Sequence, residues 1–257
     1  MRIVRCSAHG QASYGVVRDE EVHLLDRSPF GVEEPVETGR VVALEEATLL
    51  TPTEPSTIYA IGRNYSEHAK EMGYQLTGTP SVFLKPRSSL LPPGGTVVLP
   101  PPSASKQVQH EAELVIVIGK EARNVSEADA LSYVAGYTCA DDVTARDLQR
   151  SDTNPTRGKG YDTFCPLGPW VETELDPSAL TVRCRVNGEL RQDGNTADLL
   201  FPVPFIISWF SSWSTLLPGD VILTGSPHGT GDLADGDSVE IEIGGIGTLT
   251  HRVVASR

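Results

Sequence analysis

The chain has 257 residues and a formal net charge of −13 at pH 7. Nucleic acids and anionic membranes repel so acidic a chain, which excludes both as its main partners. Hydrophobic residues make up 39% and charged residues 21%, as in a globular protein with a sizeable core. Four scattered cysteines without C-x-x-C spacing argue against a disulfide or zinc framework and favour a reducing compartment.

No targeting or membrane segment is predicted. The N-terminus leads directly into polar residues, unlike a signal peptide. The most apolar stretch, residues 199–217, contains two prolines and four serines, which is not typical of a transmembrane helix. We predict a cytoplasmic protein and, over residues 201–217, a helix that lies in the core or at an interface.

Residues 1–53 are predicted to form a small β-rich domain, and residues 54–257 the main domain. Strands are expected over residues 1–6 and 14–25, and the second folds back through residues 18–21. Residues 28–53 are turn-rich and acidic with little periodicity. Nothing in this first domain indicates chemistry.

A candidate acid–base pair follows the strand expected over residues 58–61. The next residues are typical of a short helix that ends at Gly73, and they place His68 and Glu71 three residues apart on one face. A carboxylate beside an imidazole fixes its tautomer and raises its basicity, which suits a general base. A surface ion pair on an amphipathic helix would give the same pattern.

Two carboxylates stand at the entry of the most apolar predicted strand, residues 109–119. Side chains alternate along a strand, so Glu111 and Glu113 point to the same side. Like charges held together beside a core are unfavourable unless a cation lies between them, and a hard divalent cation prefers oxygen ligands. The alternative is that both glutamates lie at a solvated strand end.

A third carboxylate and a lysine complete the candidate site. After a helix predicted over residues 127–134, a strand over residues 136–142 ends at Asp142, which could join the two glutamates. Asp142 could equally favour the N-terminus of the next helix, which Thr144 could cap. Lys159 lies between glycines, where it could offer charge to an anionic intermediate or simply be solvated.

The last third of the chain is predicted to be mostly strand. Asn187 and Gly188 between two strand patterns are typical of a tight hairpin. Further strands are expected over residues 220–224, 238–243 and 247–254. The pattern predicts a strand-dominated α+β protein with a mixed or rolled sheet.

Taken together and in order, these motifs resemble the fumarylacetoacetate hydrolase family across residues 56–254. The motifs are Gly62-Arg63-Asn64-Tyr65 with His68 and Glu71, residues 83–86, residues 110–114, residues 142–147, Lys159 with residues 161–164, Asn187-Gly188-Glu189 with Gln192, and residues 216–225. One departure lies in residues 226–231, where Ser226 keeps the hydroxyl of a threonine common in the family. His228 and Thr230 in the same loop also depart from the family pattern.

The resemblance implies a fold, a cofactor and site residues. The fold is a mixed β-sandwich roll with a small N-terminal β-rich appendage, usually in homodimers, and the cofactor is Mg²⁺ or Mn²⁺. The implied metal ligands are Glu111, Glu113 and Asp142. The implied catalytic residues are His68 and Glu71, on a short helix in a mobile lid, and Lys159. The implied substrate-binding residues are Arg63, Tyr65, Gln192 and Thr224.

The implied reaction runs through an enolate of a small anionic 2-oxo acid. Hydrolysis of a C–C bond in an acylpyruvate-type substrate is expected first. The alternative is decarboxylation or isomerisation of a 2-oxo or 2-hydroxymuconate-type dicarboxylate, as in oxaloacetate decarboxylation or 2-hydroxyhepta-2,4-diene-1,7-dioate isomerisation during aromatic compound degradation. A non-catalytic binding protein with this fold predicts the loss of at least one site residue, whereas all are present.

Overall fold

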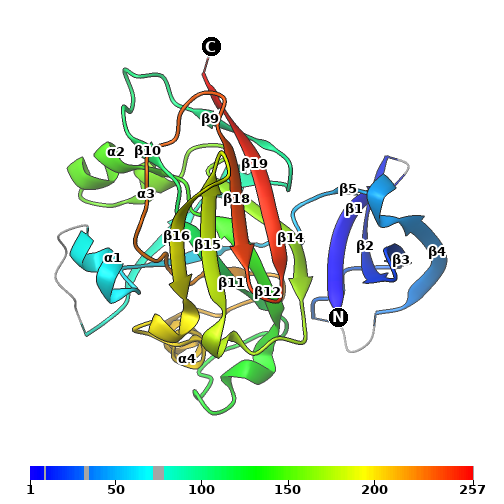
Figure 1. Cartoon of the computed structure of the whole chain (residues 1–257). Coiled ribbons are helices and arrows are strands. Elements are labelled where there is room, and N and C mark those ends of the chain that lie inside the picture. The colour runs from blue at the N-terminus through cyan, green and yellow to red at the C-terminus, as the bar shows by residue number, and fades with distance from the viewer. Residues whose placement is uncertain (9, 32–34, 72–77, 257) are drawn as a thin grey trace.

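The computed structural model describes residues 1–8, 10–31, 35–71 and 78–256. A large mixed sheet packs against a smaller one, which confirms the strand-dominated sandwich predicted from the sequence (Figure 1). Within the described residues, no helix is long and apolar enough to span a membrane.

The large sheet contains, in spatial order, β4 (Glu37–Ala43), β3 (Glu21–Leu25), β2 (Gln11–Arg18), β1 (Arg2–Ala8), β14 (Cys165–Glu172), β12 (Val134–Asp141), β11 (Ala112–Ile118), β17 (Val221–Leu223), β6 (Ile58–Gly62) and β7 (Ser81–Lys85). Beside this path, β5 (Thr48–Leu49) pairs with β1, and β8 (Leu90–Leu91) pairs with β14. The smaller sheet contains β16 (Glu189–Asn195), β15 (Thr181–Val186), β18 (Ser238–Ile243), β19 (Gly247–Ala255) and β9 (Thr96–Leu99). A separate pair joins β10 (Val108–Gln109) to β13 (Thr144–Ala145).

The α-helices are α1 (Ser66–Glu71), α2 (Arg146–Ser151), α3 (Thr156–Lys159) and α4 (Val203–Trp213). Single 3₁₀ turns are η1 (Leu44–Glu46), η2 (Arg87–Ser89), η3 (Ala130–Tyr133), η4 (Pro177–Ala179) and η5 (Thr196–Asp198). In Figure 1, α1, α2 and α3 lie on the side of the molecule opposite the N-terminal strands.

Strand β11 lies at the centre because apolar clusters cover both of its faces. Leu114 and Ile116 pack between the two sheets, whereas Val115 and Val117 pack into the cluster on the opposite face. A strand buried on both faces reads as a continuous apolar run rather than an alternating one. This central position holds the carboxylates at its entry in a rigid frame.

The N-terminal strands continue the large sheet, since Arg2 and Ile3 of β1 pair with Glu172 and Val171 of β14. The predicted reversal at residues 18–21 is confirmed as the β2–β3 turn. Within residues 28–53, where the sequence shows little periodicity, the structure has β4, whose mostly exposed residues give no apolar pattern. The domain boundary at residue 53 stays a prediction.

The helix predicted over residues 127–134 was also wrong. Ser126 and Asp129 do form a capping-type contact, with the Ser126 hydroxyl 2.7 Å from Asp129 Oδ2. Only the 3₁₀ turn η3 follows within the described residues, because Tyr133 O accepts a hydrogen bond from Gly119 N, which draws the chain into β12. This hydrogen bond between distant segments therefore limits the segment to one 3₁₀ turn.

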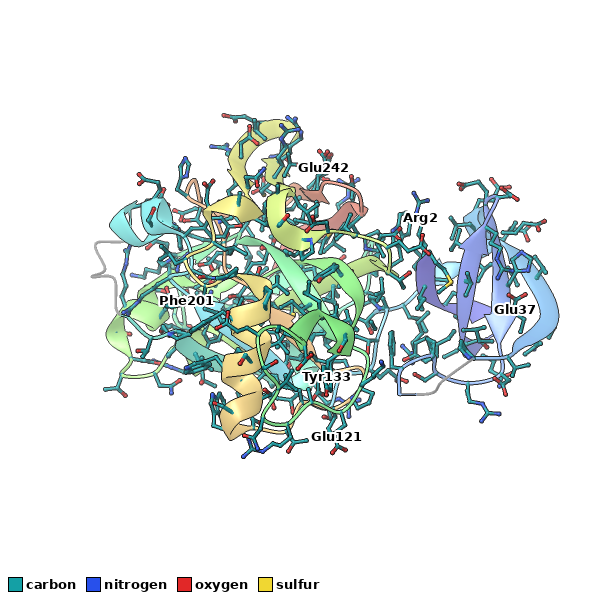
Figure 2. The ribbon with its side chains drawn as sticks, turned by 90° about the horizontal axis from the view of Figure 1, so that it is seen from below. Arg2, Glu37, Glu121, Tyr133, Phe201 and Glu242 are labelled. Carbon is teal, nitrogen blue, oxygen red and sulfur yellow. The ribbon has the colours of Figure 1, made fainter. Side chains whose placement is uncertain are left out.

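Helix α4 confirms the prediction for residues 201–217 in a shorter form. It buries Ile206, Ile207 and Phe210 in the core, while Trp213 stays half exposed. Figure 2 shows this helix on the underside of the molecule, beside Phe201. The homodimer stays a prediction.

Candidate functional site

The three predicted metal ligands converge at one end of β11 and β12. Glu111 directly precedes β11, Glu113 is its second residue, and Asp142 directly follows β12. One carboxylate oxygen from each lies within 4.8 Å of the others, and all three side chains are buried. The solvated strand end considered above is therefore excluded, and the donor set is the all-oxygen type that hard divalent cations prefer.

Three cationic side chains surround these carboxylates. Lys159 Nζ donates to Glu111 Oε2 at 2.8 Å and to Asp142 Oδ2 at 2.5 Å. Lys85 Nζ donates to Asp142 Oδ1 at 2.6 Å, and the guanidinium of Arg146 donates to Glu111 Oε1. All three are 3% exposed or less, so a solvated Lys159 is excluded as well.

The surroundings shift the pKa values of the two glutamates in opposite directions. Burial raises the pKa of Glu111, but Lys159 and Arg146 outweigh it and hold that pKa well below its ordinary value. Burial and the neighbouring Asp142 raise the pKa of Glu113 well above its ordinary value. Glu113 Oε2 accepts a hydrogen bond from Gly225 N at 2.6 Å. Glu113 is therefore the carboxylate that most needs a further cation.

Burial lowers the pKa of the Lys159 ammonium, but Asp142 and Glu111 outweigh it and raise that pKa above its ordinary value. Its side chain also lies over the ring of Phe83, with Nζ 5.0 Å from the ring centroid. Lys159 is thus held as a cation rather than prepared as a base.

A cavity of about 380 Å³ opens over the carboxylates. Its lining residues are Ile61, Gly62, Arg63, His68, Ser81, Phe83, Glu111, Glu113, Arg146, Gln149, Arg150, Asp152, Thr153, Pro155, Lys159 and Ser226. Arginine, lysine and histidine outnumber the acidic residues in this lining, so the cavity suits a small anion.

The predicted His68–Glu71 pair lies on α1, and His68 lines this cavity. His68 Nδ1 is 3.2 Å from Glu71 Oε2, and the imidazole is buried. With its Nδ1–H donated to a carboxylate, the imidazole keeps a lone pair on Nε2 that can accept a proton. Gly229 N also donates to Glu71 Oε1 at 3.2 Å, which fixes the carboxylate. The helix end predicted at Gly73 lies outside the described residues, and the mobile lid stays a prediction.

The predicted substrate-binding residues are not all at the cavity. Arg63 lines it, with a left-handed backbone φ of 63° that is uncommon for arginine and often marks functional sites. Tyr65 lies in a neighbouring cavity of about 320 Å³ together with His228. Thr224 is fully buried, and its hydroxyl donates to Leu114 O. The substrate contacts of Tyr65 and Thr224 therefore stay predictions without support from the cavity.

Gln192 has a structural role that the sequence did not reveal. Its side-chain oxygen accepts from Ala112 N at 3.0 Å and lies 3.0 Å from His110 Nδ1, while its nitrogen donates to Ser226 Oγ and Pro227 O. All four hydrogen-bonding positions of the amide are thus used by protein atoms. Gln192 ties β11 to the loop that carries Ser226.

Replacing Gln192 with leucine is expected to destabilise the protein by about 3 kcal/mol, because it leaves several buried polar groups unpaired. The KM of the folded variant is expected to stay near the wild-type value. Urea unfolding and steady-state kinetics measure the two effects. A stable variant with a much higher KM would instead support the predicted substrate contact.

Sequence reasoning did not select three residues that the structure brings to the site. Lys85 and Arg146 stood within motifs of the resemblance, but nothing local indicated that they contact Asp142 and Glu111. Gln149, one helical turn after Arg146, lines the cavity, and its side-chain oxygen accepts a hydrogen bond from the Arg146 guanidinium. Their i, i+3 spacing on α2 was the signal that could have placed both on one helix face.

The capping role suggested for Thr144 was wrong. Its hydroxyl donates to Asp142 O at 2.8 Å and contacts Glu111 Oε1 at 3.3 Å, so it supports the carboxylates instead. Helix α2 begins without a side-chain cap.

Comparisons with known proteins match both parts of the chain. Residues 57–254 match the model of the fumarylacetoacetate (FAA) hydrolase C-terminal family, which covers more than half of the chain. The chain belongs to the fumarylacetoacetate hydrolase family. Residues 1–52 match a second model, described as Rv2993c-like, N-terminal. The resemblance stated from the motifs is confirmed.

Relatives with named activities differ in reaction. The 4-hydroxyphenylacetate degradation bifunctional isomerase/decarboxylase of Escherichia coli is 41% identical over 249 residues, which are 95% of this chain and 58% of that protein. A 5-carboxymethyl-2-hydroxymuconate delta-isomerase from Mycobacterium smegmatis is 41% identical with a TM-score of 0.93, and both chains are fully covered. A maleylpyruvate hydrolase from Sphingobium sp. SYK-6, solved with manganese(II) and pyruvate, is 32% identical with a TM-score of 0.81 and full coverage of both chains. The protein is thus an enzyme of a family that includes isomerases, decarboxylases and hydrolases.

Proposed function

We propose that the protein is a Mg²⁺- or Mn²⁺-dependent enzyme that acts on 2-oxo acids bearing a second carboxylate, through an enolate. The observation that carries this proposal is the buried triad of Glu111, Glu113 and Asp142 on the floor of the cavity, with His68 at its wall. The triad fits a divalent cation because its third member, Glu113, lacks a cationic partner in the described residues.

Charge supports a dianionic substrate. When all three carboxylates are ionised, as they would be around a metal, their charge equals that of the three buried cations Lys85, Arg146 and Lys159. A divalent cation would leave an excess of two positive charges, which an anion of two charges would neutralise. Arg150 in the cavity lining adds to this preference.

Bound metal would supply Lewis-acid stabilisation of negative charge on the 2-oxo oxygen of the substrate. The Lys159 ammonium, fixed between Glu111 and Asp142, adds a preorganised positive charge that needs no proton movement during reaction. The Arg146 guanidinium and Thr144 hydroxyl hold Glu111 in place. These residues together favour any reaction that forms an enolate beside a carboxylate.

Hydrolysis of a C–C bond is the reaction that uses the His68–Glu71 pair. His68 Nε2 takes a proton from water, whose oxygen attacks the acyl carbonyl of an acylpyruvate. The C–C bond then breaks, a carboxylic acid leaves, and the electron pair of that bond remains as the enolate of pyruvate. The proton held on His68 returns to the enolate carbon, so the enzyme ends in its starting state.

Decarboxylation or isomerisation is the second candidate, favoured by the relatives that are 41% identical. Both reactions form an enolate at the same oxygen and use Lys159 in the same way. Decarboxylation needs no activated water, because the bond that breaks releases carbon dioxide and leaves its electron pair as the enolate. Isomerisation needs no water either, but it needs a base for the proton that it moves, and His68 is available for that. Decarboxylation therefore depends less on His68.

Metal removal tests the proposed centre. Dialysis against EDTA is expected to reduce turnover at least about a hundredfold, and added Mn²⁺ or Mg²⁺ is expected to restore it, because no other group balances the enolate charge as strongly. The substrates to compare are acetylpyruvate, maleylpyruvate, oxaloacetate and 2-hydroxyhepta-2,4-diene-1,7-dioate. We expect the three dicarboxylates to exceed acetylpyruvate in kcat/KM. Turnover undiminished by EDTA would contradict the metal centre, and equal kcat/KM for acetylpyruvate would contradict the charge argument.

A further inference from the structure

A second buried acid–base pair lies directly behind the carboxylate triad. His251 Nε2 is 2.8 Å from Asp141 Oδ2, and neither side chain has any exposed surface. Neither residue lines the main cavity or contacts the proposed dyad. The proposed reaction therefore gives this pair no direct role.

The pair is joined to the backbone of Glu111. Asp141 Oδ1 accepts a hydrogen bond from Glu111 N at 2.7 Å, while its other oxygen faces His251. Asp142 N donates to Glu111 O at 2.9 Å, so both backbone polar groups of Glu111 are tied to the end of β12. The pairing of β11 with β12 begins at Ala112 and Asp141, so Glu111 lies one residue before it. The backbone N–H of Glu111 therefore takes its acceptor from the Asp141 side chain instead of from the neighbouring strand.

His251 connects the two sheets at this point. It lies on β19 in the smaller sheet, whereas Asp141 ends β12 in the large sheet. The buried positions of β19 alternate through Leu249, His251 and Val253. An apolar side chain would fill such a position without a partner, whereas a buried imidazole is unfavourable unless it is hydrogen-bonded. The imidazole thus has a specific partner, and that partner holds a proposed metal ligand.

We propose that His251 is a positioning residue for the metal centre. It fixes the carboxylate of Asp141, which holds the backbone of Glu111 and thereby keeps the Glu111 carboxylate beside Glu113 and Asp142. This inference rests on the proposed metal-dependent function. Partners one contact beyond metal ligands orient them, and their loss typically weakens metal affinity about 10- to 100-fold. A pair that served only to join the sheets would change stability without changing metal affinity.

Mn²⁺ affinity separates these two roles. EDTA-stripped full-length protein is titrated with Mn²⁺, and free Mn²⁺ is measured from its electron paramagnetic resonance signal, below the unfolding temperature of each variant. His251→Leu removes the donor at similar volume and is expected to raise the Mn²⁺ Kd about 10- to 100-fold. His251→Gln places an N–H near the position of Nε2 and is expected to stay within about threefold of wild type.

Thr196→Val is the matched control. The buried Thr196 hydroxyl donates to Pro177 O and accepts from Leu180 N, so its loss destabilises the fold without a direct contact to the triad. Its Mn²⁺ Kd is expected to equal that of wild type. The inference is overturned if His251→Leu binds Mn²⁺ as wild type does, or if Thr196→Val weakens binding equally. Should His251→Leu not fold, His251→Asn, which is too short to reach Asp141, replaces it with the same expected rise in Kd. Failure of wild type to bind Mn²⁺ would instead reject the proposed metal centre.

Discussion

Glu113→Gln is expected to abolish turnover while leaving the metal-free protein at least as stable as wild type. The substitution removes a proposed ligand, so turnover should fall at least about a hundredfold. It also removes a buried carboxyl whose charged form is opposed by burial and by Asp142 and Glu111. The glutamine oxygen can still accept the hydrogen bond from Gly225 N. Loss of an unbalanced buried charge is commonly neutral or stabilising.

The difference in stability between wild type and Glu113→Gln is expected to depend on pH in a defined direction. Because the folded pKa of Glu113 lies above the unfolded value, the folded metal-free protein binds this proton more tightly. The stability from Glu113 is fully present below the unfolded pKa and is lost as the pH rises through the folded pKa. Wild type and Glu113→Gln should therefore agree in stability at acid pH and diverge as the pH rises, with the variant more stable. Urea unfolding in EDTA at about pH 5 and about pH 8 measures the difference.

Glu111→Gln is the matched control for Glu113→Gln. The two substitutions are chemically identical and two residues apart, but Glu111 is paired with Lys159 and Arg146. Its loss leaves the buried Arg146 without a partner carboxylate and Lys159 with Asp142 alone, so this variant should be inactive and less stable by several kcal/mol. Equal destabilisation by both substitutions would contradict the difference in charge environment.

The parts of the site that the sequence predicts are those encoded locally. Strand alternation places Glu111 and Glu113 on one side, and a strand that ends in acid places Asp142 at an edge. The residues of α1 likewise place His68 beside Glu71. In each case the side chains that meet are separated by a few residues or lie at strand ends that pair with each other. The structure brings His68 and the carboxylate triad to one cavity, with Glu71 hydrogen-bonded to His68.

The parts that could not be predicted depend on contacts between distant segments. Gln192 is 80 residues from Ala112 and 34 from Ser226, and its four hydrogen bonds exist only once β16 packs against β11. His251 meets Asp141 across 110 residues of sequence. In the sequence both look like ordinary polar residues in strand patterns, because alternation predicts which face a side chain occupies but not its partner there. Periodicity alone does not predict that these motifs meet at one site. That prediction came from the resemblance to the family.

His68→Ala is expected to separate hydrolysis from the enolate reactions that share the site. Hydrolysis of an acylpyruvate needs a base for water, so its kcat should fall about 10²- to 10⁴-fold. Decarboxylation of oxaloacetate needs the charge of the metal centre and Lys159 but no activated water, so its kcat should fall less than about tenfold. Parallel assays of pyruvate release from both substrates, with saturating Mn²⁺, measure the two rates in one preparation.

Glu71→Gln and Lys159→Met sharpen this comparison, because they act on different parts of the site. Glu71→Gln keeps a group that can accept the Nδ1–H of His68 but removes the negative charge beside the imidazole, so hydrolysis should fall by less than in His68→Ala. Lys159→Met removes the preorganised cation beside Glu111 and Asp142 and should slow both reactions together. Equal loss of hydrolysis and decarboxylation in His68→Ala would place His68 with Lys159 as a group common to all reactions and would reject its role in activating water. A selective loss would assign the choice between hydrolysis and its alternatives to α1, and the formation of the enolate to the centre built on β11 and β12.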